Sequence, residues 1–306
     1  MTARPALDPT QPIHWILDWD GTITRRDTLD ALVSIAASAK PGSPVLEEWK
    51  RVSEAYKDDY TAALEKLAPG DKLPSTVKEE RKLLLALRNV EQTSLERVSA
   101  SGIFAGLTQK LLEEGASNAI DSRKVEIRDG CTEFLQSKRT NDYDSLDLLS
   151  VNWSRHFISS CLMAANTPVG HDSIYANELD GIEANRTSHG IISPKGEAKI
   201  SIISSSDKLE YMTRLKEQDK RTVVYVGDSW TDIECLLEAD LGICIRDEPI
   251  GSSQKKLAER LQSLGVHCPH LSASTKSGER QVVWARDFAD IQAWTNVRNA
   301  HNAQST

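Results

Sequence analysis

The chain has 306 residues, with 37 lysine and arginine residues against 45 aspartate and glutamate residues, which gives a net charge of −8. This acidic balance disfavours nonspecific binding to nucleic acid or to anionic membranes, so an anionic substrate would need local positive charge or a metal ion. The hydrophobic content of 39% can build a sizeable core, and no apolar run approaches the roughly 18 residues of a membrane span. We expect one large domain or a core with a second module, and the oligomeric state stays open.

The five cysteines are scattered and show no Cys-x-x-Cys spacing. This pattern favours reduced thiols in a cytoplasmic protein. The first twelve residues contain three prolines and no apolar stretch, so they do not resemble a signal peptide. We expect flexible tails at residues 1–12 and 301–306.

The first strong structural signal lies in residues 14–24. The apolar run Trp15-Ile-Leu17 is too short for a helix and predicts a buried strand that ends at Asp18. Asp20 follows two positions later, and side chains at positions i and i+2 of an extended segment point the same way. Gly21 then permits a sharp turn. The two carboxylates are therefore expected to face one small volume, although an acidic surface turn is the simpler alternative.

Residues 27–124 show helical periodicity throughout. Apolar stripes run from Leu29 to Ala36, from Leu46 to Leu67 after Pro44, from Val77 to Val98, and from Phe104 onwards. No strand pattern interrupts them. We interpret residues 27–124 as a helical module inserted directly after the first strand and its turn.

From residue 125 onwards, apolar strand patterns alternate with helical ones. The predicted strands are 146–150, short strands within 172–193, 222–226, 241–245 and 281–285. The predicted helices are 131–138, one opening at 152–154, one capped by residue 206 or 207, one that carries Leu236 and Leu237, 254–264 and 288–297. Such alternation predicts an α/β fold with a Rossmann-like parallel sheet that is covered by helices on both faces. The expected core is discontinuous and comprises residues 13–26 and 125–300.

Polar residues follow several of these strands or open the next helix. Because the carboxyl ends of parallel strands share one edge of a sheet, we expect these side chains to meet there. The residues are Asp18, Asp20, Ser150, Lys208, Asp228 and Asp232. Crowded carboxylates call for a hard cation, so we predict that the four aspartates bind Mg²⁺.

This set of residues suits phosphoryl transfer. Ser150 and backbone N–H groups near Asn152 would bind a phosphate, and Lys208 would supply fixed positive charge, unless it is a solvated lysine at a helix start. Asp18 would attack phosphorus, and Asp20 would protonate the leaving oxygen and then activate water.

These positions resemble the four motifs of the haloacid dehalogenase (HAD) superfamily of phosphatases. Asp18-Trp-Asp20-Gly-Thr22 is similar to the first motif, Ser150 to the second, Lys208 to the third, and Gly227-Asp-Ser-Trp-Thr-Asp232 to the fourth, in family order. The resemblance implies Mg²⁺, the roles given above and metal binding through the backbone carbonyl of Asp20. It also implies that residues 27–124 form a C1-type helical cap, as in phosphoserine-phosphatase-like members. The segment Arg128-Asp-Gly130, which leads back into the core, also resembles those members.

A finer resemblance concerns two segments. The segments 224–243 and 149–154 are similar to the HAD domain of the plant bifunctional thiamine monophosphate phosphatase, although this chain lacks that protein's other half. Thiamine monophosphate is therefore one candidate among small phosphorylated metabolites. A phosphatase of methionine salvage and a pyridoxal phosphate phosphatase stay open as alternatives.

Three further residues are candidates for substrate contact. Asp27 lies where the chain enters the predicted cap, and a helix N-cap is its plain alternative role. Trp153 and Trp230 could stack on an aromatic or cationic ring, or could simply pack behind the site.

The predicted function is that of an Mg²⁺-dependent phosphomonoester hydrolase that forms an aspartyl-phosphate. A phospho-ligand-binding regulatory protein and a phosphotransferase that uses the same intermediate are the alternatives. A measurement of turnover distinguishes a binding protein from an enzyme. The effect of added alcohols on phosphate release distinguishes a phosphotransferase from a hydrolase.

Overall fold

The computed structural model describes residues 12–139, 143–194, 201–219, 221–273 and 281–303. These residues form two compact units. The first comprises the chain up to Arg25, Ile127–Leu149 and the chain from Lys208, and the second comprises Arg26–Glu126 and Ser150–Asp207. The predicted tails fall mostly outside the described residues.

A parallel sheet forms the centre of the first unit. Its strands lie in the order β2-β1-β6-β7-β8, and every neighbouring pair is parallel. Their bounds are β1 Ile13–Leu17, β2 Ser145–Leu149, β6 Thr222–Gly227, β7 Leu241–Ile245 and β8 Gln281–Ala285. All five residues of β1 are buried, as are those of β7, because both strands lie inside the sheet.

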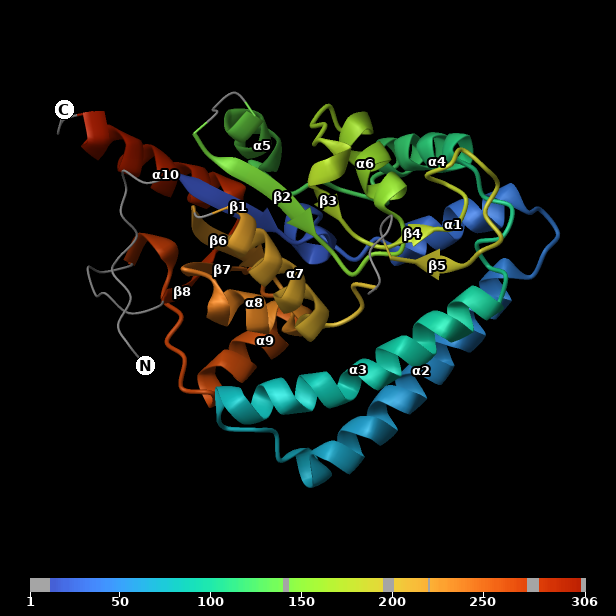
Figure 1. Ribbon diagram of the computed structural model, residues 1–306, viewed down its shortest axis with the longest axis horizontal. Coiled ribbons are helices and arrows are strands. Elements are labelled where there is room, and N and C mark those ends of the chain that lie inside the picture. The colour runs from blue at the N-terminus through green and yellow to red at the C-terminus, as the bar shows by residue number, and fades with distance from the viewer. Residues whose placement is uncertain (1–11, 140–142, 195–200, 220, 274–280, 304–306) are drawn as a thin grey trace. The chain divides into compact units, whose positions relative to one another are not determined.

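Helices cover both faces of this sheet (Figure 1). On one face, the Trp15 ring lies 4.9 Å from the Phe134 ring and 6.5 Å from the Trp294 ring, between centroids. These partners belong to α5 (Cys131–Arg139) and α10 (Phe288–Ala303), whereas α7 (Ser205–Gln218) and α8 (Ile233–Glu238) cover the opposite face. Helix α9 (Ser252–Ser263) completes the unit. The predicted α/β fold with a parallel, Rossmann-like sheet is confirmed.

The second unit is mainly helical. Its long helices α2 and α3 lie side by side (Figure 1), and the Tyr56 hydroxyl on α2 donates a hydrogen bond of 2.9 Å to Glu91 on α3. The helices of this unit are α1 Leu29–Ala39, α2 Val45–Leu67, α3 Val77–Ala100, α4 Gln109–Asp121 and α6 Arg155–Ala164, and its short strands are β3 Ile174–Tyr175, β4 Glu178–Leu179 and β5 Ile192–Ser193. Strands β4 and β5 pair antiparallel.

Both units also contain short helical turns. Those of the first unit are η1 Trp19–Ile23, η4 Trp230–Asp232 and η5 Leu271–Ala273, and those of the second are η2 Pro69–Asp71 and η3 His171–Ser173.

One helix start differs from the sequence prediction because a polar cap overrides the apolar pattern. The helix expected from Phe104 begins at Gln109, where the Thr108 side chain accepts a hydrogen bond from the Leu111 N–H. The helix expected to open at 152–154 begins at Arg155 with Ser154 as its N-cap, and Ser154 accepts from the Phe157 N–H, so this start is confirmed.

The helix expected to be capped by residue 206 or 207 begins at Ser205. The Ser204 hydroxyl accepts a hydrogen bond from the Asp207 N–H, so Ser204 rather than either predicted residue holds that amide. Asp207 instead accepts from the Ser204 hydroxyl and from the Ile203 N–H. The division into a core and a 27–124 cap stays a prediction, since the second compact unit also takes in residues 150–207.

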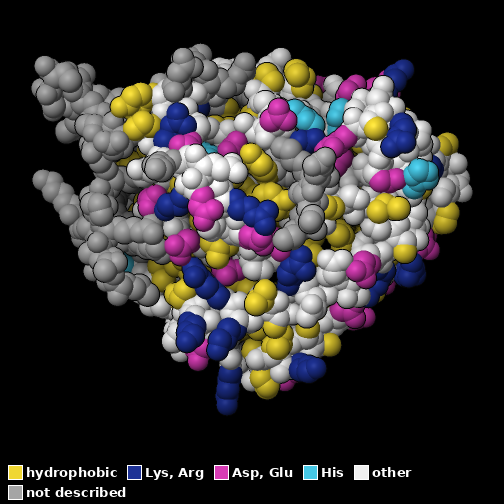
Figure 2. Space-filling view, viewed as in Figure 1, with side chains coloured by type: hydrophobic (Ala, Val, Ile, Leu, Met, Phe, Trp, Pro, Cys, Tyr) yellow, Lys and Arg dark blue, Asp and Glu magenta, His cyan; other side chains and the backbone are white. Residues whose placement is uncertain are grey.

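The surface carries both signs of charge. Figure 2 shows acidic and basic side chains interspersed over the described residues of one face. Within the described parts of the chain, none of the helices combines the length and apolar character needed to cross a membrane.

Candidate active site

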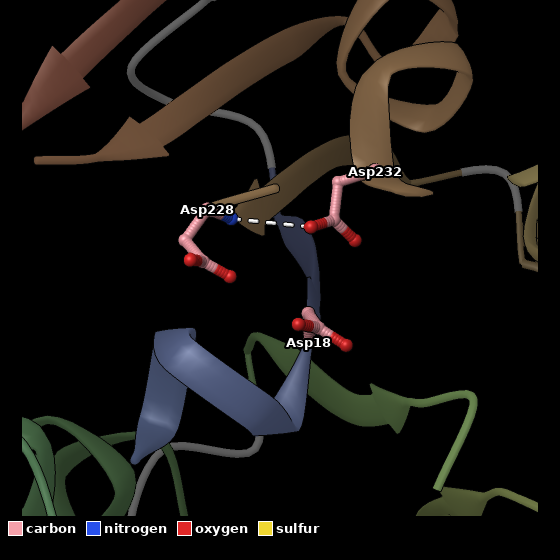
Figure 3. Close-up of side chains that lie close together, drawn as sticks. All are labelled: Asp18, Asp228 and Asp232. Atoms are coloured by element: carbon pink, nitrogen blue, oxygen red, sulfur yellow. Dashed lines mark hydrogen bonds between the residues drawn. The ribbon is translucent and has the colours of Figure 1, made fainter. Parts of the chain in front are cut away.

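Three buried carboxylates meet at the carboxyl end of the central strands. Asp18 follows β1, Asp228 follows β6, and Asp232 ends η4. One oxygen from each carboxylate lies within 4.8 Å of the others, and Figure 3 shows the three side chains converging. Since Leu17 and Val226 are register partners in neighbouring parallel strands, the residues that follow them are brought together, as the sequence predicted.

Lys208 on α7 is the cation of this cluster. Its ammonium donates hydrogen bonds of 2.6 Å to Asp18 Oδ1 and 2.7 Å to Asp232 Oδ1, and its side chain is fully buried. Burial alone would lower the pKa of Lys208, but the two carboxylates outweigh it and raise this pKa. One ammonium therefore faces three carboxylates. Burial, followed by the charge of Asp232, raises the pKa of Asp18 well above its ordinary range despite Lys208.

Asp232 is saturated with hydrogen-bond donors. Its Oδ1 accepts from Lys208 and, at 2.7 Å, from the Tyr225 hydroxyl. Its Oδ2 accepts from the Asp228 N–H (Figure 3), the Ser229 N–H and the Ser229 hydroxyl at 3.0–3.1 Å. Asp232 thus fixes the loop that carries Asp228, and its predicted role as a metal ligand stays a prediction.

Asp228, in contrast, has an open oxygen. Its Oδ2 accepts a hydrogen bond of 2.9 Å from the Ser253 hydroxyl, whereas its buried Oδ1 has no hydrogen-bond partner. Burial, with Asp232 as a second cause, raises the pKa of Asp228 to about 7. A Cβ at Gly21 would lie 2.5 Å from Asp228 Oδ2, so only glycine leaves this space open. An unpartnered buried oxygen beside a second carboxylate fits a hard cation such as Mg²⁺.

The turn after β1 is held by a residue that was not predicted to belong to the site. The buried guanidinium of Arg128 donates 2.7 Å to the Gly21 carbonyl and 2.9 Å to the Thr22 carbonyl, and it pairs with Asp247 just after β7. Gly21 takes a positive φ of 77°, which the sharp exit requires. Asp20 lies in this turn, is partly exposed and is not part of the three-carboxylate cluster.

Sequence reasoning missed Arg128, Tyr225 and Ser253 as parts of this site. Tyr225 could have been found, because a hydroxyl in the middle of a buried strand needs a polar partner. Arg128 and Ser253 are distant in sequence from their partners, so no local pattern reveals their contacts.

The other predicted phosphate-binding residues belong to the second unit. Ser150 and Asn152 are buried, and the Ser150 hydroxyl accepts a hydrogen bond of 3.1 Å from the Asn152 N–H. The Asn152 side chain donates to Thr28 and accepts from the Ser154 N–H, which orders the loop after β2. Phosphate binding by these residues stays a prediction.

The three candidate substrate residues all have contacts within their own units. Asp27 is exposed and accepts from the Leu29 N–H, while Thr28 occupies the cap position of α1. The Trp153 ring packs against Trp49 and Phe104, with centroids 5.8 and 5.9 Å away. The Lys256 ammonium lies 4.3 Å from the centre of the Trp230 ring, so this indole packs against α9. Substrate contact stays a prediction for all three.

The fold is shared with several solved structures. A structure of phosphoserine phosphatase with a phospho-aspartyl intermediate analogue covers 93% of this chain with a TM-score of 0.50 and 16% identity. A substrate-bound phosphoserine phosphatase gives 0.51 at 15% identity over the same share, and 98% of each of these two chains is matched. A Bordetella pertussis protein of unknown function gives 0.51 at 13% identity and covers 90% of this chain and 99% of its own. The chain therefore shares the fold of phosphoserine phosphatase, as the resemblance in sequence implied.

Curated proteins show similarity in sequence. No protein-family model matches the chain. The Bifunctional TH2 protein, mitochondrial, of Arabidopsis thaliana is 27% identical over 74% of this chain and 38% of its own length. Cold tolerance protein 1 of Saccharomyces cerevisiae is 26% identical over 72% of this chain and 74% of its own.

A higher identity links the chain to fission yeast. A CTO1 family protein of Schizosaccharomyces pombe is 31% identical over 241 residues, which are 76% of this chain and 81% of that protein. At this identity and coverage, the chain belongs to the CTO1 family.

Proposed function

We propose that this protein is an Mg²⁺-dependent phosphomonoester hydrolase that acts on a small phosphorylated metabolite through an aspartyl-phosphate. The observation that carries the proposal is the imbalance of the site: three buried carboxylates face one lysine, and Asp228 Oδ1 has no hydrogen-bond partner. Three buried carboxylates beside one lysine favour a further cation, and a bound cation would in turn attract an anionic phosphate group. The shared fold with phosphoserine phosphatase supports the same reading.

Asp18 and Asp228 would hold the cation, with the predicted contributions of Asp20 and Asp232. When bound, Mg²⁺ supplies positive charge that neutralises the carboxylates and polarises a phosphate oxygen. The strong bond from Lys208 fixes Asp18 Oδ1 at 2.6 Å, whereas Asp18 Oδ2 accepts only a long bond of 3.5 Å from the Thr22 hydroxyl. Asp18 Oδ2 is therefore the better placed nucleophile.

Proton transfer falls to Asp20 in this proposal. Asp20 lies on the turn after β1, is less buried than Asp18 and is not part of the Lys208 pair. Its carboxyl group would give a proton to the leaving oxygen and then take one from the water that attacks the aspartyl-phosphate. Lys208 would balance the negative charge that develops on the phosphoryl group. Ser150 and Asn152 would complete phosphate binding.

The substrate candidates are small phosphomonoesters, among them thiamine monophosphate. One observation supports this candidate: the 27% identity to the Bifunctional TH2 protein over 74% of this chain, together with the resemblance of segments 224–243 and 149–154 to the plant thiamine monophosphate phosphatase domain. The alternatives from methionine salvage and pyridoxal phosphate belong in the same test.

The test is phosphate release from p-nitrophenyl phosphate with Mg²⁺, followed by a panel of phosphorylated metabolites that includes thiamine monophosphate and pyridoxal phosphate. We expect turnover that EDTA abolishes and that Asp18→Asn lowers by a factor on the order of 10³ or more. The matched control is Asp144→Asn, which changes another buried Asp–Lys pair of the same unit. A folded protein that stays inactive with Mg²⁺ across the panel would refute the proposal.

A further inference from the structure

One buried asparagine joins two segments of the second unit. Asn177 lies between β3 and β4 and is fully buried. Its Oδ1 accepts a hydrogen bond of 2.9 Å from the Ile202 N–H, and its Nδ2 donates 2.8 Å to the Ile202 carbonyl. The same Nδ2 donates 3.1 Å to the Asn152 carbonyl and 3.3 Å to the Val151 carbonyl. A single side chain therefore ties the loop after β2 to the segment before α7.

The segment around Ile202 depends on this amide for its pairing. Residues 201–203 lie in neither a helix nor a strand, so no strand partner satisfies the buried backbone of Ile202. The Asn177 side chain offers Ile202 one acceptor and one donor, as a neighbouring strand would. An aspartate of the same size would keep the acceptor, but it would set a negative charge against three carbonyl oxygens. The position therefore requires an amide.

The segment that Asn177 holds leads directly into α7. The Ile203 N–H donates 3.1 Å and the Ser204 hydroxyl donates 2.8 Å to Asp207 Oδ2. The Asp207 N–H in turn donates 3.2 Å to the Ser204 hydroxyl. Lys208 is the next residue of the same helix. Asn177 and Asp207 together therefore order the chain up to the residue before Lys208.

On its other side, Asn177 orders the loop that contains Ser150. The Asn177 N–H donates 3.2 Å to the Asn152 carbonyl, and its carbonyl accepts 2.9 Å from the Arg155 N–H. The Ser150 N–H donates 2.9 Å to the Tyr175 carbonyl. The Ser150 hydroxyl accepts from the Asn152 N–H, an interaction that uses a lone pair and leaves the hydroxyl hydrogen for an acceptor such as phosphate.

We propose that Asn177 is a positioning residue that fixes the Ser150–Asn152 loop against the start of α7 and so preorganises the phosphate-binding groups. This role rests on the proposed function, which assigns phosphate binding to the loop. Donors that folding has already fixed need no further ordering when phosphate binds. Loss of Asn177 would leave buried backbone groups of both segments without their partner and would release the loop.

The first test is the binding of inorganic phosphate with Mg²⁺, measured by titration calorimetry, because this readout does not depend on turnover. Asn177→Ala should weaken binding about 10-fold, the order expected for one hydrogen bond to a charged group. Asn177→Asp should weaken it at least as much, although it keeps the size of the side chain. Equal affinities in the unsubstituted protein and Asn177→Ala, or no phosphate binding by either, would overturn the proposal.

A matched control removes a comparable set of hydrogen bonds elsewhere in the second unit. Asp180 accepts bonds of 2.9–3.0 Å from the Ser188 hydroxyl and from the His189 and Ile191 N–H groups. Asp180→Ala should leave the affinity for phosphate unchanged. A loss as large as that of Asn177→Ala would mean that general loosening of the unit, and not the position of the loop, sets the affinity, which would overturn the proposal.

Turnover separates this proposal from the proposed function. Asn177→Ala should lower kcat for p-nitrophenyl phosphate about 100-fold, the order that a displacement of about 1 Å costs. An unsubstituted protein without turnover would refute the proposed function, and phosphate affinity would still decide the role of Asn177.

A measurement on the unsubstituted protein covers the case in which the variants do not fold. Phosphate with Mg²⁺ should slow amide hydrogen exchange in residues 150–155 and in residues 201–207 together, because Asn177 couples the two segments. Slower exchange in only one of the two segments would overturn the proposal.

Discussion

One buried Asp–Lys pair lies at the amino ends of the parallel strands and another at their carboxyl ends. We call these ends the amino edge and the carboxyl edge. The pKa of the aspartate is shifted in opposite directions in the two pairs. Just before β2, Asp144 accepts 3.0 Å from Lys138, 2.9 Å from the Ile13 N–H and 3.3 Å from the Trp15 indole. Both charged side chains are 7% exposed. Burial acts to raise the pKa of Asp144, but these donors outweigh it, and this pKa is lowered.

At the carboxyl edge, Asp18 and Lys208 form the same kind of pair at 2.6 Å, but the pKa of Asp18 is raised. The difference lies in the neighbours. Asp144 is surrounded by donors, whereas Asp18 shares its lysine with Asp232 and faces Asp228. The amino-edge pair is complete as it stands and holds β1 and β2, whereas the carboxyl-edge pair is short of positive charge. A structural ion pair and a candidate catalytic one are thus distinguished by their unbalanced charge and not by their distance or burial.

The largest expected effect comes from removing each lysine. Lys208→Met should lower phosphatase turnover by a factor on the order of 10³, because the developing phosphoryl charge loses its fixed cation. Lys138→Met should leave turnover close to the unsubstituted value but lower the free energy of unfolding by about 3 kcal/mol, because the buried Asp144 carboxylate would lose its only cation pair among the residues that the structure describes. Turnover and urea unfolding measure the two effects. Equal losses of turnover in both variants would contradict the distinction.

A smaller effect is expected at the turn after β1. Arg128→Lys should lower kcat about 100-fold with little change in KM, because one ammonium cannot hold the Gly21 and Thr22 carbonyls and Asp247 together. Arg25→Lys is the matched control, since Arg25 pairs with the exposed Asp129. A change confined to KM would mean that Arg128 does not position the reacting groups.

Mg²⁺ binding should raise the free energy of unfolding through the carboxyl-edge aspartates and not through the amino-edge pair. With Mg²⁺ at about 100 times its dissociation constant, the protein should gain about 2.7 kcal/mol against unfolding. Asp228→Asn should abolish this gain, whereas Asp144→Asn should keep it. Thermal unfolding with and without Mg²⁺ measures the gain. Equal Mg²⁺ stabilisation of the unsubstituted protein and Asp228→Asn would place the cation elsewhere.

The smallest expected effect concerns how the free energy of unfolding, measured without metal, depends on pH. Asp144 and Asp18 should contribute to this dependence with opposite signs. The lowered pKa of Asp144 means that its contribution is present above the ordinary value of 3.8 and is lost as pH falls further. The raised pKa of Asp18 means that stability is lost as pH rises above 3.8. The loss of unfolding free energy caused by Asp144→Asn should therefore shrink as pH falls below 3.8. The gain of unfolding free energy caused by Asp18→Asn should grow as pH rises from 3.8 towards neutral. Urea unfolding at several pH values tests both signs, and slopes of the same sign would contradict the comparison.

Much of the carboxyl edge could be predicted because its residues follow apolar strands. Asp18 and Asp228 end such strands, and parallel pairing alone brings them together. The role of Asp232 could not be predicted in the same way. Its spacing from Asp228 suggests a ligand, but its two oxygens accept from Lys208, Tyr225 and the 228–229 loop, which only the folded chain reveals.

Arg128 shows a second limit of sequence reasoning. It lies more than 100 positions from the carbonyls it binds, and a buried arginine has no local signature. The start of one helix was misplaced for a different reason. The apolar pattern begins at Phe104, but the helix begins only at Gln109, where the Thr108 hydroxyl accepts a hydrogen bond from the Leu111 N–H.

The turn after β1 also bears on how the chain accommodates its long first insertion. Thr24 bridges to Ile127, and the Arg128 N–H donates 2.8 Å to the Ile23 carbonyl. The chain therefore leaves the first unit and returns to it at adjacent points, like the two sides of a hairpin. Because the cost of closing a loop grows only slowly with its length, the segment between these points can lengthen, shorten or be exchanged with little penalty to the sheet. Changes in the inserted segment can thus be made separately from changes at the carboxyl ends of the strands.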